Sequence, residues 1–270
     1  MMEPNVMETT PSPRTSRVHL IIVAVLLLAI GAGSVGWYRS AHRAPADDTV
    51  AADLMHAGID PAKRAAFEEL VHAYILEHPE ILPEAMDRLQ ARENADRLKP
   101  VRAALETPFP GAVLGNPAGK VTLVEFSDFA CTYCRGSVAD INALIAANPD
   151  LKVVLRELPI IAPESLPAAK MALAAAAQGK FAAYHAAMFA GPRPDSASIT
   201  AAARVAGLDL GAAQAFAKRS EVQQEIEHNL AYARQLGISG TPAFAIGGQI
   251  IPGAVGRDKL QDAVDAARKS

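Results

Sequence analysis

The feature that most constrains this chain is a pair of cysteines between a strand-like run and a helix-like run. The chain has 270 residues and two cysteines, Cys131 and Cys134. A β-branched apolar run at 121–126 predicts a buried strand before them, and apolar residues at helical spacing over 139–145 predict a helix after them. A disulfide between such close cysteines removes little entropy from the unfolded chain. We therefore expect the pair to serve chemistry rather than stability.

The position of the pair assigns a different role to each sulfur. A helix start carries unpaired N–H groups and partial positive charge, which lowers the pKa of a thiol there. We therefore expect Cys131 to be the nucleophile and Cys134, one turn later, to resolve a mixed disulfide or close a redox-active Cys131–Cys134 disulfide. Since a helix start is normally accessible, two structural core cysteines are the weaker interpretation. Thr132 and Tyr133, between the cysteines, are candidates for tuning the potential and contacting substrate.

A metal site is the main alternative for two cysteines at this spacing. Zinc needs two further ligands, and the sequence has no other cysteine. His185 and His228 stand singly within helical patterns. We therefore expect no resident metal and no cofactor. Soft Cu(I) held by Cys131 and Cys134 stays open as an alternative, which would make the chain a copper-handling protein.

Two acidic residues precede the cysteines. Glu125 interrupts the apolar run six residues before Cys131. It is either a solvent-facing strand residue or a buried acid that relays protons during thiol exchange. Asp128 is expected to be a turn or helix-capping residue.

The N-terminal region predicts an extracytoplasmic location. Residues 18–38 contain no Asp, Glu, Lys or Arg, and about 20 apolar residues span a bilayer core of roughly 30 Å. We expect residues 1–17 to be a cytoplasmic leader and 18–38 a single-pass anchor in a bacterial inner membrane, with the remainder in the periplasm. A cleaved signal peptide is the alternative, since Ala44 and Ala46 form an A-x-A pattern.

A helical segment follows a predicted linker at 39–60. Residues 61–99 carry apolar side chains at helical spacing, interrupted by Pro79 and Pro83. This apolar stripe must be buried against either the following domain or other copies of the chain. A homo-oligomer formed through 61–99 is therefore one of two open interpretations.

Residues 110–270 predict one α/β domain after a loop-rich boundary at 100–119. Net charge is -3 and no cluster of Lys and Arg stands out, which gives no indication of nucleic-acid binding. The elements expected after the first strand and helix are a strand at 152–158, helices over about 163–235, a strand at 243–246, a Gly247–Gly248 turn, a strand at 249–251 and a helix at 257–268.

Several segments together resemble the DsbA family. They are Val-Glu-Phe-Ser-Asp-Phe-Ala-Cys-Thr-Tyr-Cys-Arg at 124–135, Glu-Leu-Pro at 157–159, Gln-Gly-Lys-Phe at 178–181 and Gly-Ile-Ser-Gly-Thr-Pro-Ala-Phe at 237–244. The resemblance covers about 110–268 and implies a thioredoxin-like fold with a helical insertion. It also implies that Pro242 is cis beside the cysteines, that Thr241 contacts the reactive sulfur, and that both bind substrate. Glu125 falls at the family's acidic position, which favours the proton relay.

A second resemblance concerns the segment before the domain. Tyr-Ile-Leu-Glu-His-Pro-Glu-Ile-Leu-Pro-Glu-Ala-Met at 74–86 is similar to the N-terminal segment of ScsC-type members, some of which oligomerise through it. The Cys-Thr-Tyr-Cys centre lacks the histidine of the Cys-Pro-His-Cys oxidases, which argues against strong oxidising power. The resemblances imply a thiol–disulfide oxidoreductase that forms, reduces or isomerises disulfides in exported proteins. Its partners would be cysteine-containing exported substrates and a membrane redox protein acting on Cys131 and Cys134.

Overall fold

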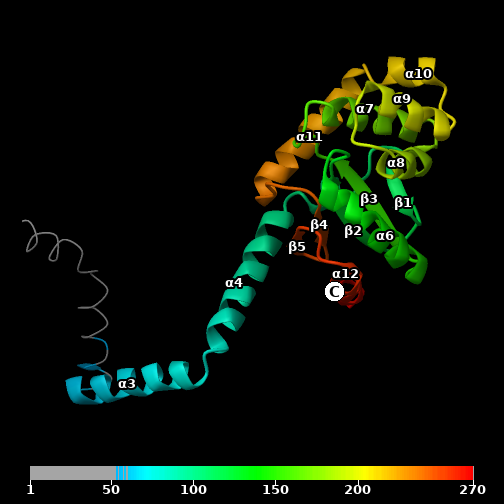
Figure 1. The fold of residues 1–270 in the computed structure, drawn as a ribbon. Helices are drawn as coiled ribbons and strands as arrows, with labels where there is room; N and C mark the ends of the chain where they lie inside the picture. The colour runs from blue at the N-terminus through cyan, green and yellow to red at the C-terminus, as the bar shows by residue number, and fades with distance from the viewer. Residues whose placement is uncertain (1–52, 54, 57, 59, 270) are drawn as a thin grey trace, which may run out of the picture. The chain divides into compact units, whose positions relative to one another are not determined.

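The computed structural model describes residues 53, 55–56, 58 and 60–269, drawn in colour in Figure 1. The chain divides into two compact units after Pro79. The predicted leader and anchor lie outside the described residues, as does most of the predicted linker. Among the helices that are described, none combines the length and the apolar character needed to cross a membrane.

The first unit contains helix α3, Pro61–Glu77. Asp60 caps its start by accepting a 2.9 Å hydrogen bond from the N–H of Lys63, and Pro61 occupies the first turn, where its missing N–H is not needed. The helix ends before Pro79, since proline disfavours the helical conformation of the residue before it. The exposed large apolar side chains of α3 are those of Phe67, Leu70, Val71, Tyr74 and Leu76.

The second unit begins with helix α4, Ile81–Leu98. Its C-terminal residue Leu98 is buried in a cluster with Leu105 and Val124. Pro83 lies in the first turn of α4, where proline does not break a helix. The structure therefore groups α4 with the following domain, whereas the sequence pattern treats 61–99 as one segment. The reason is the apolar contact of the last turn, which helical periodicity alone does not assign.

A five-stranded mixed sheet forms the centre of the second unit, in the order β1-β3-β2-β4-β5. The neighbours β2 and β3 are parallel, and the other pairs are antiparallel. The predicted strands are confirmed, while β1 and the short helix α5, Arg102–Leu105, arise in the region expected to be loop. The strands are β1 Val113–Gly115, β2 Val121–Ser127, β3 Leu151–Glu157, β4 Ala243–Ile246 and β5 Gln249–Pro252.

Helices cover both faces of this sheet. Alternate side chains of β2 point to opposite faces, so Leu123 packs with α6, Thr132–Ala147, and α12, Arg257–Ala267, while Phe126 packs on the other side. That other side is covered by α11, Ser220–Leu236, and by the ends of α4 and α5. Both predicted helices, after Cys134 and at the C-terminus, are confirmed.

A helical insertion separates β3 from β4, as predicted for residues 163–235. Figure 1 shows α7 to α10 gathered at one end of the sheet, with α11 returning along it. Buried alanines in α7 allow close helix packing, and Phe181 and Tyr184 of α8 are buried in the core. The result is a thioredoxin-like fold with a helical insertion. Its helices are α7 Ser165–Ala177, α8 Phe181–Ala190, α9 Ser196–Val205, α10 Leu210–Phe216 and α11.

Candidate active site

Cys131 lies at the junction that the sequence predicts, as the N-cap of α6. Its sulfur accepts a 3.3 Å hydrogen bond from the main-chain N–H of Cys134. Its thiol donates a 3.1 Å hydrogen bond to the main-chain oxygen of Thr241. The sulfur is thus held between an amide donor at the helix start and a main-chain carbonyl acceptor. The fold therefore brings Cys131, Cys134 and Thr241 together, as the resemblance implies.

The two cysteines are reduced and differ in their surroundings. Cys131 is 5% exposed and Cys134 is fully buried, whereas the helix-start argument predicts that both are accessible. Burial raises the pKa of the Cys134 thiol to about 12, so this sulfur keeps its proton at neutral pH. The asymmetry agrees with the predicted division of roles, in which Cys131 attacks first.

The peptide bond between Thr241 and Pro242 is cis, as the resemblance implies. The oxygen of Pro242 accepts a 2.9 Å hydrogen bond from the N–H of Gly253. The hydroxyl of Thr241 is buried and has no hydrogen-bond partner of good geometry among the described residues. It nevertheless lies close enough to Cys134 to offset part of the burial effect on the pKa of that thiol. Thr241 therefore contacts both reactive residues, one through its main chain and one through its side chain.

Thr132 and Tyr133 form the first turn of α6 beside the buried sulfurs. Both side chains are exposed, and that of Tyr133 is 71% exposed. An exposed aromatic side chain next to a reactive sulfur provides apolar surface for an incoming polypeptide. Their predicted part in substrate contact stays a prediction.

Glu125 is buried on the face of β2 that packs against α6, so the solvent-facing interpretation is wrong. Burial raises the pKa of its carboxyl to about 8, an effect that Ser127 partly offsets. A carboxyl with this pKa takes up or releases a proton near neutral pH. The position therefore provides the buried acid that a proton relay requires.

A second buried acid, Glu157, was not among the predicted site residues. It pairs with Ser127 across the parallel strands β2 and β3, which places it on the same sheet face as Glu125. Burial raises the pKa of Glu157 well above its usual range, and the charges of Asp128 and Glu125 raise it further. The sequence feature that could have indicated this buried acid is the charged pair Arg156 and Glu157 within an otherwise apolar strand.

Asp128 shapes the turn between β2 and α6, in agreement with the predicted turn role. Its buried carboxylate ties this turn to the segment after β3. Carboxylates that accept several N–H groups form strong, charge-assisted hydrogen bonds. The donors are the N–H groups of Ala130, Ile160 and Ile161 and the hydroxyl of Ser165, at distances of 2.7 to 2.9 Å.

Of the two histidines considered as metal ligands, His185 is part of the core. His185 is 5% exposed and its ring packs against those of Phe129 and Phe189. Burial lowers its pKa to about 4, so it stays neutral. Within the described part of the chain, no group of three or more His, Cys, Asp or Glu residues is arranged to hold a metal ion.

Family comparisons agree with this geometry. The family described as "DSBA-like thioredoxin domain" matches residues 122–265, and the chain belongs to this family. The family described as "Copper resistance protein ScsC N-terminal domain" matches residues 64–95, which span most of α3 and α4.

Solved structures show the same likeness. A thioredoxin-like oxidoreductase from Silicibacter pomeroyi DSS-3 is 40% identical with a TM-score of 0.60, covering 63% of this chain and 98% of that chain. Proteus mirabilis ScsC in a transitional conformation is 28% identical with a TM-score of 0.59, covering 79% and 99%. Salmonella enterica Typhimurium BcfH is 25% identical with a TM-score of 0.57, covering 82% and 99%.

Curated sequences match over a shorter part. The Na(+)/H(+) antiporter NhaA 3 of Salinispora tropica is 30% identical over 160 residues, which is 57% of this chain and 24% of that protein. NhaA of Herminiimonas arsenicoxydans is 30% identical over 161 residues, 58% of this chain and 25% of that protein. The chain thus spans about a quarter of the length of these curated relatives.

Proposed function

We propose that this chain is a thiol–disulfide oxidoreductase that acts on exported proteins through Cys131 and Cys134. The Cys131 thiolate attacks a substrate disulfide, forms a mixed disulfide and releases one substrate thiolate. The Cys134 sulfur then attacks the Cys131 sulfur, which releases the second substrate thiol and leaves a Cys131–Cys134 disulfide. The reverse sequence oxidises a substrate dithiol. The observation that best supports this proposal is that the Cys131 sulfur lies between the Cys134 N–H and the Thr241 oxygen.

The second step requires a proton transfer. Cys134 must lose its proton to attack, and its burial opposes this. Glu125 lies on the sheet face that packs against α6 and has a pKa of about 8, so it is our proposed proton acceptor. Ionised Glu125 becomes neutral when it accepts this proton, which removes its charge from beside the second buried acid, Glu157, whose pKa that charge raises.

The proposed location is outside the cytoplasm, with residues 18–38 as a membrane anchor. Support comes from the uncharged N-terminal run and from a periplasmic thioredoxin-like protein of Salmonella enterica serovar Typhimurium, 30% identical with a TM-score of 0.57 over 63% of this chain and 97% of that chain. Disulfides persist in that compartment. A membrane redox protein would return Cys131 and Cys134 to the redox state in which they react with the next substrate.

The direction of electron flow depends on self-association. Exposed apolar residues of α3, including Phe67 and Tyr74, form a stripe that a second copy could cover, and this part of the chain matches the ScsC N-terminal family. We propose that α3 mediates homo-oligomerisation and that the chain acts as an isomerase or reductase rather than as a strong oxidase. The absence of histidine between Cys131 and Cys134 agrees with this proposal.

Copper handling is the second candidate function. The printed name of the family matching 64–95 refers to copper resistance, and the two sulfurs at Cys131 and Cys134 suit Cu(I). Stoichiometric Cu(I) binding by the reduced protein without disulfide exchange would favour it. Exchange that proceeds in the presence of a Cu(I) chelator would favour the oxidoreductase.

The experiment that tests the proposed function is a trapping assay. Cys134→Ala removes the resolving sulfur, so covalent complexes with exported proteins should accumulate and disappear on reduction. Cys131→Ala is the matched control and should accumulate none. If neither variant forms reducible complexes in cells that export disulfide-containing proteins, the proposal is wrong.

A further inference from the structure

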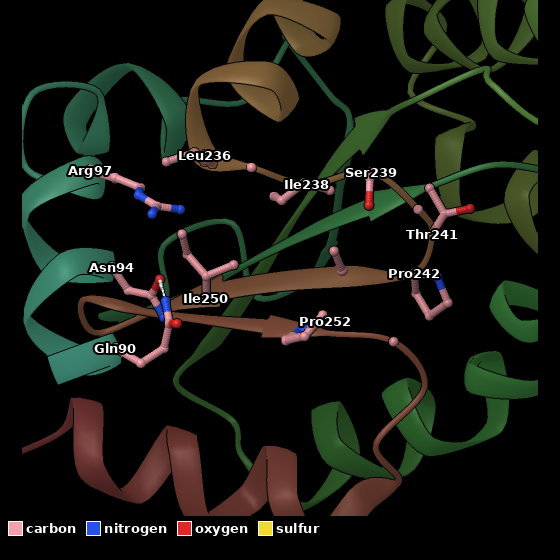
Figure 2. A pocket seen from close by; sticks show the side chains of 14 residues that line it. Gln90, Asn94, Arg97, Leu236, Ile238, Ser239, Thr241, Pro242, Ile250 and Pro252 are labelled. Carbon is pink, nitrogen blue, oxygen red and sulfur yellow. Dashed lines mark hydrogen bonds between the residues drawn. The ribbon is translucent and has the colours of Figure 1, made fainter. Parts of the chain in front are cut away.

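A cavity of about 500 Å³ adjoins the Thr241–Pro242 turn. Figure 2 shows Thr241 and Pro242 at one end, side chains of α4 at the other, and the loop at 238–240 with β5 between them. The thiol of Cys131 donates to the main-chain oxygen of Thr241, a residue that also lines the cavity, so the cavity adjoins the reactive site. A substrate chain held at Cys131 would pass this opening.

The loop along the cavity presents unused main-chain groups. Ser239 and Gly240 are exposed and Thr241 is half-buried. Within the described residues, no hydrogen bond engages the N–H groups of these three residues. Free main-chain donors beside a cavity suit an extended polypeptide, which pairs with them as an added strand.

The far wall of the cavity is polar and comes from α4. Gln90, Asn94 and Arg97 follow each other at spacings of four and three residues, so they share one helix face. The Gln90 amide donates a 3.0 Å hydrogen bond to the Asn94 oxygen, as the dashed line in Figure 2 shows. This bond fixes both side chains at the cavity wall.

Arg97 gives the cavity its charge. Among the residues that line it, Arg97 carries a formal charge and no acidic residue is present. Its guanidinium has an exposed partner, Glu93, at 3.4 Å, and such surface pairs contribute little. The guanidinium also approaches Gly237, where a side chain would come within 3.2 Å of it. The remaining lining is largely apolar, including Ile238, Ile250 and Pro252.

We propose that this cavity is a specificity site for the substrate polypeptide, which binds an extended segment with an acidic side chain against Arg97. The inference rests on the proposed function, because the segment is the continuation of a chain joined to Cys131. The 238–241 loop binds its main chain, Ile250 and Pro252 contact its apolar side chains, and α4 selects its charge. Helix α4 thereby contributes to substrate choice.

The test measures mixed-disulfide formation in the Cys134→Ala background with peptide disulfides. Each peptide carries one cysteine, which is held in a disulfide. The series places a Glu, Gln or Lys at one position at a time on either side of that cysteine. Glu at one or two positions should react about five- to tenfold faster than Lys there, as expected for a single ion pair near a docking site. Arg97→Glu should reverse the preference, and Arg97→Gln should abolish it.

Arg92→Glu is the matched control, since Arg92 is an exposed arginine of α4 outside the cavity lining. It should keep the preference, and oxidised glutathione should react equally with all variants. Equal rates for Glu, Gln and Lys peptides, with normal glutathione reaction, would overturn this inference alone. A change of oligomeric mass in Arg97→Glu without a change in peptide preference would instead identify a second copy as the occupant. Failure of every disulfide to react would overturn the proposed function as well.

Discussion

The thiol of Cys131 donates a 3.1 Å hydrogen bond to the main-chain oxygen of Thr241, although 110 positions separate them along the chain. The strand order of the sheet explains why Cys131 and Thr241 lie next to each other. Cys131 follows β2 and Thr241 precedes β4, and these strands are antiparallel neighbours in which Phe126 pairs with Ala243. The helical insertion between them leaves this register unchanged. The site therefore depends on two adjacent central strands rather than on one local motif.

The Thr241 hydroxyl should speed the second exchange step. Thr241→Val keeps the shape and the main-chain oxygen but removes the hydroxyl that lowers the pKa of Cys134. We expect the pKa of this thiol to rise further and the mixed disulfide to persist longer. Acid quenching and intact-mass analysis measure the trapped fraction over time. Thr241→Ser keeps a hydroxyl and should resemble the parent protein; an equally short-lived intermediate in Thr241→Val would contradict the assignment.

Glu125 should make stability depend on pH. Its pKa is about 8 in the folded protein against 4.5 for an ordinary glutamate, so the unfolded chain loses this proton at lower pH than the folded one. The stabilisation is complete below pH 4.5 and is lost as pH rises through 8. Since one pKa unit corresponds to about 1.4 kcal/mol and the shift is from 4.5 to about 8, the full effect is on the order of 5 kcal/mol.

Denaturant unfolding of Glu125→Gln between pH 4 and pH 9 checks this expectation. The variant should lose less stability with rising pH than the parent protein, because it has no buried carboxyl at this position to ionise. Glu221→Gln replaces an exposed carboxyl and is the control. Parallel stability curves for Glu125→Gln and the parent protein would contradict a buried, protonated Glu125.

Arg156 should be a major stabilising residue of the face opposite α6. Its buried guanidinium donates to the main-chain oxygens of Ala104, Leu105 and Thr107 and pairs with Glu225 at 2.6 Å. Arg156→Met would leave a mostly buried carboxylate and several carbonyls without partners. We expect the free energy of unfolding to fall by about 3 to 5 kcal/mol.

The control for this effect is an exposed pair of the same type. Arg102 pairs with Glu106 at 2.7 Å, and its side chain is about half exposed. Arg102→Met should cost less than about 1 kcal/mol. Urea unfolding measures both variants, and similar losses in the two would refute the importance of the buried network.

Self-association through α3 predicts a mass change. Phe67 and Tyr74 are 65% and 53% exposed on α3, so replacing both with Glu would add charge to the surface proposed to be covered by another copy. We expect residues 47–270 to exceed the monomer mass in solution and the double variant to return to it. His72→Glu adds charge at another exposed position of α3 and is the control. A monomeric parent protein in light scattering would exclude oligomerisation.

The sequence predicted the parts of the site that local patterns encode. The apolar run of β2, the helix after Cys131 and the strand after Thr241–Pro242 all have signals within a few residues. The five-strand order could not be read this way, because β1 has three residues and lies in a Pro- and Gly-rich region. The contact between Thr241 and Cys131 was predicted from the resemblance to the DsbA family and not from sequence periodicity.

The buried polar groups needed the three-dimensional register. Glu157 reaches the face of Glu125 because it pairs with Ser127, which no spacing in the sequence reveals. Asp128 binds N–H groups 32 and 33 positions away. Helical periodicity likewise gives α4 an apolar stripe but does not show that its polar residue Arg97 lines a cavity.

In the proposed mechanism, Cys131 attacks the substrate and Cys134 resolves the mixed disulfide. The most direct measurement compares the reaction of reduced Cys134→Ala and Cys131→Ala with oxidised glutathione, followed by intact mass over time. We predict that Cys134→Ala gains one glutathione at Cys131 at least about tenfold faster than Cys131→Ala gains one at Cys134. Equal rates, or faster reaction at Cys134, would contradict the account.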